Sequence, residues 1–128
     1  MGRQFTVRLK NEPGALAALA ELLAEHDIDI RAVGAAVVGK QGYVVLTTTN
    51  DVAARELLRG AKYTFQEGET ITAYVEDYPG SLARTTRSLA DAGVNIQGLL
   101  VMGRREGKAQ LAFTVDNVAK AKRALGVV

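Results

Sequence analysis

The order of apolar and polar residues along the chain predicts an alternation of strands and helices. Phe5 to Leu9 alternate between apolar and polar side chains, which is typical of a strand with one buried face. Leucines then recur every three or four residues from Leu16 to Leu23, as in a helix with one buried face. Continued along the chain, the pattern predicts strand 5–9, a helix from about 14 to 25–27, strand 29–38, hairpin turn 39–42, strand 43–49, helix 51–59, strand 62–65, linker 66–69, strand 70–76, helix 80–92, strand 94–102, turn 103–108, strand 109–115 and helix 118–125.

The second half of the chain repeats the first. The segment Asn11–Ala17 reads Asn-Glu-Pro-Gly-Ala-Leu-Ala, and it returns at Asp77–Ala83 as Asp-Tyr-Pro-Gly-Ser-Leu-Ala. The two prolines of the chain occupy the same place in the two segments, and the residues that follow stay in register. We therefore expect two modules of common origin, residues 1–67 and residues 68–128, and a site in one module should have a counterpart in the other.

Each module has the element order β-α-β-β-α-β, which defines its expected fold. The predicted fold class is α+β, with two tandem ferredoxin-like modules, each an antiparallel sheet that carries both helices on one face. In the second module only Gly126–Val128 follow the last helix, so its final strand should be short, absent or supplied from elsewhere. A module of this size buries a small core, and we expect the modules to pack against each other or against another subunit.

Composition and charge narrow the classes of partner. The chain has 16 Lys and Arg residues and 14 Asp and Glu residues, with both signs interspersed. This small excess of base is not the concentrated patch that nucleic acid or an acidic membrane requires, so neither is expected as a partner. The sequence contains no cysteine, which excludes disulfides, cysteine nucleophiles and cysteine-ligated zinc. The N-terminus does not resemble a signal peptide and no apolar run is long enough to span a membrane, so the cytoplasm is the expected location.

The sequence offers little for catalysis. His26 is the one histidine; it lies at the end of the first predicted helix, and Ala92 takes its place in the second module. The acidic residues near it belong to the same helix end, so they cannot complete a Ser/His/Asp arrangement. The carboxylates do not have metal-ligand spacing, and the glycines do not form a phosphate-binding loop. We therefore expect a protein that is not an enzyme and needs no cofactor.

The repeated turn is the better candidate for a binding site. It leads into a helix whose first N–H groups have no partner within the helix and are suited to a carboxylate. Asp29 and Asn95 open the strand after each helix, and we expect them to converge with Asn11 and Asp77 of the turns; a carboxylate and an amide suit an α-amino acid. The same residues are also ordinary helix starters and turn caps, so a structural role stays open. The candidate ligand-binding residues are Asn11, Glu12, Pro13, Gly14, Ala15, Leu16, Asp29, Ile30, Asp77, Tyr78, Pro79, Gly80, Ser81, Leu82, Asn95 and Ile96.

Together these features resemble the ACT domain, and the chain as a whole resembles small proteins made of two ACT domains in tandem. The resemblance rests on the turn, the leucine-striped helix, the segments Asp27–Ile30 and Gly93–Ile96, and the hairpin that leads into a strand rich in β-forming residues. It implies a ferredoxin-like fold that binds small ligands, usually amino acids, at the interface between paired modules and that regulates metabolic enzymes. It also implies ligand contacts from the loop residues Asn11 and Asp77 and from the strand openers Asp29 and Asn95.

The function that the resemblance implies is a non-catalytic regulatory module that binds an amino acid. The expected partners are that ligand, a second copy in a homodimer, and a metabolic enzyme. Each module keeps one asparagine and has aspartate at the other position, so the two sites should differ. Side-chain selectivity is expected from apolar positions, namely Leu16, Val33, Leu82 and Leu99. Two other interpretations remain: a protein-interaction module without ligand binding, and a nucleic-acid-binding protein of the same element order, for which the third strands lack the usual basic and aromatic residues.

Overall fold

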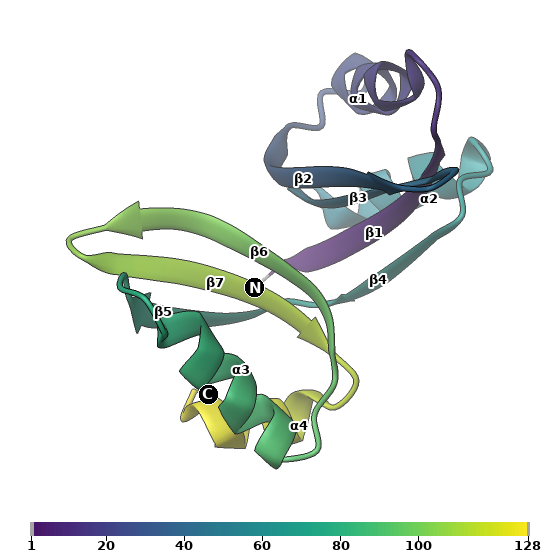
Figure 1. Ribbon diagram of the computed structural model, residues 1–128. Coiled ribbons are helices and arrows are strands. Elements are labelled where there is room, and N and C mark those ends of the chain that lie inside the picture. Colours follow the sequence, from purple (N-terminus) through teal and green to yellow (C-terminus); the bar gives the residue numbers. More distant parts are fainter. Residues whose placement is uncertain (1, 128) are drawn as a thin grey trace. The chain divides into compact units, whose positions relative to one another are not determined.

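The computed structural model describes residues 2–127, which divide into two compact units, Gly2–Gly68 and the residues from Glu69 onward (Figure 1). The order of helices and strands predicted from the sequence is confirmed as far as the last helix. The first group of elements is β1 (Arg3–Lys10), α1 (Ala15–Glu25), β2 (Ile30–Val38), β3 (Gln41–Thr48), α2 (Asp51–Gly60) and β4 (Phe65–Glu69). The second group is β5 (Ile71–Glu76), α3 (Ser81–Asp91), β6 (Ile96–Arg105), β7 (Lys108–Val115) and α4 (Val118–Leu125).

The first unit is a four-stranded sheet covered by two helices. Its strands lie in the order β2-β3-β1-β4, and β3 pairs antiparallel with both β1 and β2. Alternate residues of β1 point to the buried face because side chains of a strand alternate between its two sides. There they meet the buried residues of both helices in one core, which contains Phe5, Val7, Leu9, Leu19, Leu23, Ile28, Val44, Leu46, Ala54 and Leu58. Both helices therefore pack against the same face of the sheet, as the sequence predicts.

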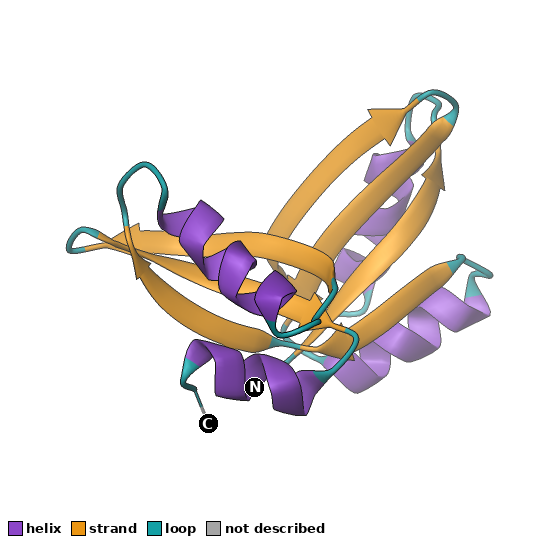
Figure 2. Cartoon of the chain, turned by 60° about the horizontal axis from the view of Figure 1, so that its bottom comes forward, coloured by secondary structure: helices purple, strands orange, loops and turns teal. Residues whose placement is uncertain are grey.

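The second unit repeats this arrangement with one strand fewer. Its strands lie in the order β5-β7-β6, antiparallel throughout, and α3 and α4 pack over the same sheet face (Figure 2). Leu89 of α3, Phe113 of β7 and Ala121 of α4 are fully buried at its centre. Within residues 2–127, no strand of this unit takes the place beside β5 that β4 takes beside β1. The short or missing final strand that the sequence predicts is therefore absent from the described part of the chain.

Two predicted boundaries are wrong. The fourth strand was placed at 62–65 with a linker at 66–69, whereas β4 spans Phe65–Glu69 and the expected linker is the strand itself. The second hairpin turn was placed at 103–108, whereas β6 continues to Arg105 and only Glu106 and Gly107 form the turn, both with positive φ (53° and 75°). In both places polar or charged residues continue a strand, where the sequence pattern favours a loop.

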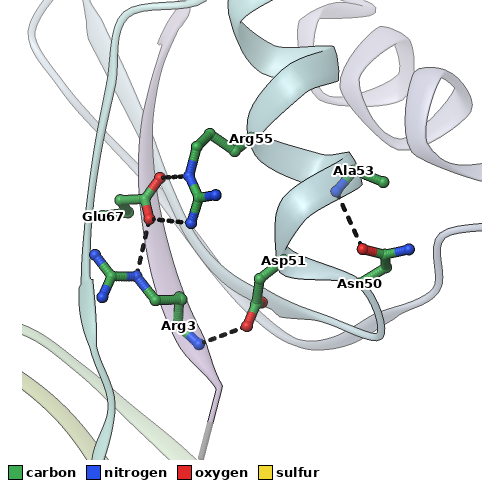
Figure 3. A network of polar contacts seen from close by, with 6 residues as sticks. All are labelled: Arg3, Asn50, Asp51, Ala53, Arg55 and Glu67. Atoms are coloured by element: carbon green, nitrogen blue, oxygen red, sulfur yellow. Dashed lines mark hydrogen bonds and ion pairs between the residues drawn. The ribbon is translucent and has the colours of Figure 1, made fainter.

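Charge pairing explains why a polar segment forms β4. The Glu67 carboxylate accepts hydrogen bonds from Arg3 Nε at 2.8 Å and from Arg55 Nε and one terminal nitrogen at 2.6 and 2.7 Å (Figure 3). Its side chain is only 15% exposed, so these ion pairs are largely shielded from water. Hydrogen bonds from Arg55, and then from Arg3, hold the pKa of the Glu67 carboxyl below its ordinary value, although partial burial opposes them.

Asparagine side chains fix the start of one helix in each unit. The Asn50 side chain accepts a hydrogen bond from the Ala53 N–H at 3.1 Å, and the Asn117 side chain accepts one from the Lys120 N–H at 3.0 Å. Each satisfies an N–H group that has no partner within its helix. None of the helices in the described part of the chain is long and apolar enough to cross a membrane.

Candidate functional site

The turn that was predicted to bind ligand has the same backbone in both units. Gly14 and Gly80 stand at the N-cap positions of α1 and α3 with φ of 87° and 93°. This left-handed conformation favours glycine because a Cβ atom would crowd the following carbonyl oxygen. No heavy atom lies within 4 Å of the place where a Cβ would be built on either residue. The glycines are therefore required by the backbone conformation rather than by lack of space.

A substitution in the first unit tests this explanation. We expect Gly14→Ala to lower the free energy of unfolding by about 1–2 kcal/mol because alanine is strained at positive φ. Gly60 lies in α2 without positive φ and also has open space around its Cβ position, so Gly60→Ala should raise stability by about 0.5–1 kcal/mol. Urea unfolding followed by circular dichroism measures both. The same sign of change for the two variants would contradict the explanation.

The turn itself uses some of the backbone amides that were expected to be free. The Ala15 N–H donates to the Glu12 carbonyl at 3.3 Å, and the Ser81 N–H donates to the Tyr78 carbonyl at 3.2 Å. The N–H groups of Leu16 and Leu82 come next and have no acceptor within residues 2–127. Each helix start therefore keeps an N–H donor at Leu16 or Leu82 for an anionic group.

Asn11 and Asp77 tie the turn to the neighbouring hairpin and do not cap the helix. Asn11 Nδ2 donates to the Gly39 carbonyl at 3.3 Å, directly after β2. In the second unit the Asp77 carboxylate pairs with Arg104 Nε at 3.2 Å, near the end of β6. The two side chains differ in chemistry but hold the loop in the same place. The Oδ1 atom of Asn11 accepts no hydrogen bond from the described residues.

Asp29 and Asn95 lie at the opposite end of each sheet, so the predicted convergence within one module is wrong. The Asp29 N–H donates to Thr49 Oγ1 at 3.0 Å, and the Asn95 N–H donates to Asp116 Oδ1 at 2.9 Å. The nine residues of β2 separate Asp29 from the hairpin that Asn11 contacts. At about 3.3 Å per residue this is roughly 30 Å. The side chains of Asp29 and Asn95 are exposed and have no partner within residues 2–127.

The other predicted residues take several positions. Ile30 and Ile96 pack against the cores of their units. Tyr78 stacks with Arg84, whose guanidinium lies 5.0 Å from the ring centre and donates to the tyrosine hydroxyl. Ser81 is buried, and its backbone closes the second turn. Glu12, Pro13, Tyr78 and Pro79 of the turns are exposed.

A groove of about 210 Å³ lies beside the turn of the first unit. We call it the loop groove. One wall is formed by predicted site residues, Asn11, Glu12, Ala15 and Leu16. The opposite wall and the floor come from β1, β2 and β3, namely Leu9, Lys10, Ala35, Ala36, Val37, Gly42, Tyr43 and Val44. The structure thus brings four predicted residues of the first module to one cavity and leaves Pro13, Gly14, Asp29 and Ile30 outside it.

An apolar strip is exposed next to the loop groove. Leu16 of α1 is 45% exposed, and Val33 and Val37, on one face of β2, are each 52% exposed. In the second unit Leu82, the counterpart of Leu16, is 45% exposed, and Val101, which corresponds to Ala35 of β2 in the strand register, is 44% exposed. We call these surfaces the edge strips. Exposed apolar surface of this kind, present at the same place in both units, is typical of a surface that packs against a partner.

His26 has the structural position that the sequence predicts. It follows the last residue of α1, is exposed, and its Nδ1 atom lies 3.0 Å from the Leu22 carbonyl oxygen. Among residues 2–127, no three histidine or acidic side chains are close enough together to hold a metal ion.

Solved structures with a similar fold match the chain over almost its full length. A protein from Bacteroides thetaiotaomicron has 21% sequence identity and a TM-score of 0.78, and the match covers 98% of this chain and 86% of that chain. The regulatory subunit of aspartate kinase from Thermus thermophilus, in its ligand-free form, has 18% identity and a TM-score of 0.68 over 98% and 91% of the two chains. The regulatory subunit from Thermus flavus has 16% identity and a TM-score of 0.68 over 98% and 92%.

The sequence matches no protein-family model and no curated protein. At the identities found among solved structures, the likeness is one of fold. It extends over both units, and each unit carries the turn, helix and strand order on which the sequence resemblance rests. The chain therefore has the α+β fold of two ACT modules in tandem.

Proposed function

We propose that this protein is a non-catalytic regulatory module that binds an amino acid where two ACT modules meet and thereby changes its contacts with a metabolic enzyme. The loop groove carries the proposal, because predicted site residues and the start of α1 form one wall of a cavity of about 210 Å³. This is smaller than the roughly 300–1,000 Å³ of pockets for drug-sized ligands and suits a small metabolite. The similarity of fold to two aspartate kinase regulatory subunits supports the regulatory role.

The chemistry of the loop groove matches both charged groups of an α-amino acid. The N–H of Leu16 and the positive end of the α1 dipole attract a carboxylate. Asn11 Oδ1 and the Glu12 carboxylate are acceptors for an ammonium group. Leu16 and Val37 supply apolar surface for the side chain of the ligand. Backbone, amide and apolar contacts are therefore all available within one small cavity.

The geometry of a single unit favours a site shared between two modules. Asn11 and Asp29 lie at opposite ends of the first sheet, and Asp77 and Asn95 take the matching places in the second unit. A ligand of amino-acid size can contact a loop residue and a strand opener together only if they belong to different modules. The edge strips supply apolar surface for such pairing, within one chain or in a homodimer.

Regulation requires that the ligand distinguish two arrangements of the modules. A ligand shifts an equilibrium only by the difference between its affinities for the two states. A ligand that contacts two modules at once binds the paired arrangement better than the separated one, because half of its contacts disappear on separation. Filling the site would therefore stabilise pairing along the edge strips and alter the surface presented to an enzyme.

Substitution of the asparagines tests the site. An amide both donates and accepts hydrogen bonds, whereas a carboxylate only accepts them and repels the carboxylate of the ligand. We therefore expect Asn11→Ala and Asn95→Ala each to weaken amino-acid binding about tenfold or more, because each variant loses one hydrogen bond to a charged group of the ligand. Asp29→Ala should change the affinity about threefold or less, and Gln97→Ala, at an exposed position of β6, is the control. Isothermal titration calorimetry measures each affinity, and equal affinity of the asparagine variants and the control would contradict the site.

A further inference from the structure

Four basic residues from separate segments of the first unit line one cavity. This cavity has a volume of about 660 Å³ and lies at the end of β1, bordered by the turn before α1, the β2–β3 hairpin and the segment between α2 and β4. We call it the basic groove. Its basic residues are Arg8, Lys10, Lys40 and Lys62, and its one acidic residue is Glu12. These residues are distant in sequence, so the sequence alone does not show that they form a cluster.

Backbone hydrogen bonds bring the four basic residues together. The Arg8 N–H donates to the Thr64 carbonyl at 2.9 Å, which joins the segment after α2 to β1. This contact brings Lys62, two residues before Thr64, to the cavity that Arg8 also lines. Lys10 is paired in register with Gln41, the residue that follows Lys40 in the hairpin. The cluster is therefore set by main-chain contacts and does not depend on carboxylate partners.

Within residues 2–127, none of these four side chains has an ion pair or a hydrogen bond. The second unit also has two basic clusters, Arg104, Arg105 and Lys108 in the hairpin and Lys120, Lys122 and Arg123 on α4. They differ from the basic groove because each has members that pair with carboxylates: Arg104 with Asp77 at 3.2 Å, Lys108 with Glu76 at 3.9 Å and Lys122 with Glu69 at 3.3 Å. Unpaired like charges that line one cavity repel one another and create a positive potential that a multiply charged anion relieves.

The repeat shows that the fold does not require these charges. Tyr74 and Glu76 of β5 occupy the positions that Arg8 and Lys10 occupy in β1, and each pairs with its central strand in the equivalent register. Lys62 has a φ of 64°, a conformation in which glycine or asparagine is less strained, so the backbone does not favour a lysine there. The positive charge is a property of the first unit alone.

We propose that the basic groove binds a small molecule that carries two or more phosphate groups, such as a nucleoside triphosphate. The planar guanidinium of Arg8 matches the spacing of phosphate oxygens, and the lysines add three donors that act as point charges. Tyr63 and three alanines of the lining, Ala15, Ala18 and Ala61, form an apolar wall for the remainder of the molecule. The groove shares Leu9, Lys10, Glu12 and Ala15 with the loop groove, so the two sites adjoin. This site goes beyond the proposed amino-acid site.

Titration of the full chain with tripolyphosphate and with ATP, in separate experiments near physiological salt, tests the proposal. We expect both compounds to bind, and Arg8→Gln/Lys62→Gln to weaken both at least tenfold. Arg105→Gln/Lys120→Gln is the control: it removes the same charge from exposed residues of the second unit and should leave both affinities within twofold. Lys10→Gln/Lys40→Gln provides a second test if circular dichroism shows that the first variant is not fully folded.

Three results would overturn the proposal. The first is no binding of either compound by the wild-type chain. The second is an equal loss of affinity in the groove variant and the control variant, which would mean a general effect of net charge. The third is binding of ATP without binding of tripolyphosphate, which would place recognition outside the phosphates. Amino-acid binding is measured separately, so failure of either site leaves the other testable.

Discussion

Replacement of Phe5 by alanine is expected to unfold the first unit. Phe5 is fully buried at the centre of the core, and its ring centre lies 6.1 Å from that of Phe65 on β4. Truncation of a buried phenylalanine typically costs about 3–5 kcal/mol. A unit of this size has a total stability of only about 3–10 kcal/mol, so the loss is comparable with the whole.

Hydrogen exchange followed by residue measures this outcome. We expect the amides of β1, β3, α1 and α2 to lose protection in Phe5→Ala, because the core that they share loses its largest side chain. The control is Tyr74→Ala, which removes an aromatic side chain that is 67% exposed on β5 and should change stability by about 0.5 kcal/mol or less. A free energy of unfolding for Phe5→Ala within 1 kcal/mol of the wild-type value would contradict the fold of this unit.

Substitution of Glu67 by glutamine should lower stability by about 2 kcal/mol near neutral pH, because two arginines lose a charged acceptor in a mostly buried position. The loss should depend on pH. The pKa of the Glu67 carboxyl is lowered on folding, chiefly by hydrogen bonds from Arg55, so its contribution is complete above the ordinary value of 4.5. It disappears as the pH falls through the folded pKa, because the carboxyl is then protonated in both states.

Urea unfolding of wild type and Glu67→Gln at neutral pH and at about pH 3 checks the magnitude and the pH dependence together. The difference between the two proteins should be larger at neutral pH than in acid. Glu76→Gln is a matched control, since Glu76 pairs with Lys108 at 3.9 Å and both side chains are 57% exposed. Such a pair contributes about 0–1 kcal/mol. A difference for Glu67→Gln that is independent of pH, or that equals the control, would show that the network does not stabilise the unit.

The sequence predicts most of the fold because hydrophobic spacing and turn residues agree at each element. Asn50 predicts the start of the helix at Asp51, and its side chain does cap that helix. The segment 66–69 was assigned to a linker because it contains two glutamates and a glycine. Its role in β4 depends on Arg3 and Arg55, which are distant in sequence and become partners of Glu67 only in the folded chain.

The candidate site was predicted in part. The turn residues Asn11 and Leu16 do line a cavity, because the motif determines both the loop and the start of the helix. Asp29 does not join them, since α1 carries the chain to the far end of the sheet before β2 begins. The opposite wall, Ala35–Val37 and Tyr43, was not predicted because pairing of β2 with β3 is what brings it beside the turn. The basic groove was missed for the same reason: its charges come from separate segments.

The central claim, that the chain binds an amino acid, is tested most directly by thermal unfolding of the wild-type protein in the presence of each of the twenty amino acids at millimolar concentration. A ligand that binds only the folded state stabilises it by about 2.7 kcal/mol when its concentration is one hundred times its Kd, which raises Tm by several degrees. We predict such a rise for one chemical class of amino acid and no rise for the others. An unchanged Tm with all twenty would contradict amino-acid binding and favour a module that acts through protein contacts at the edge strips alone.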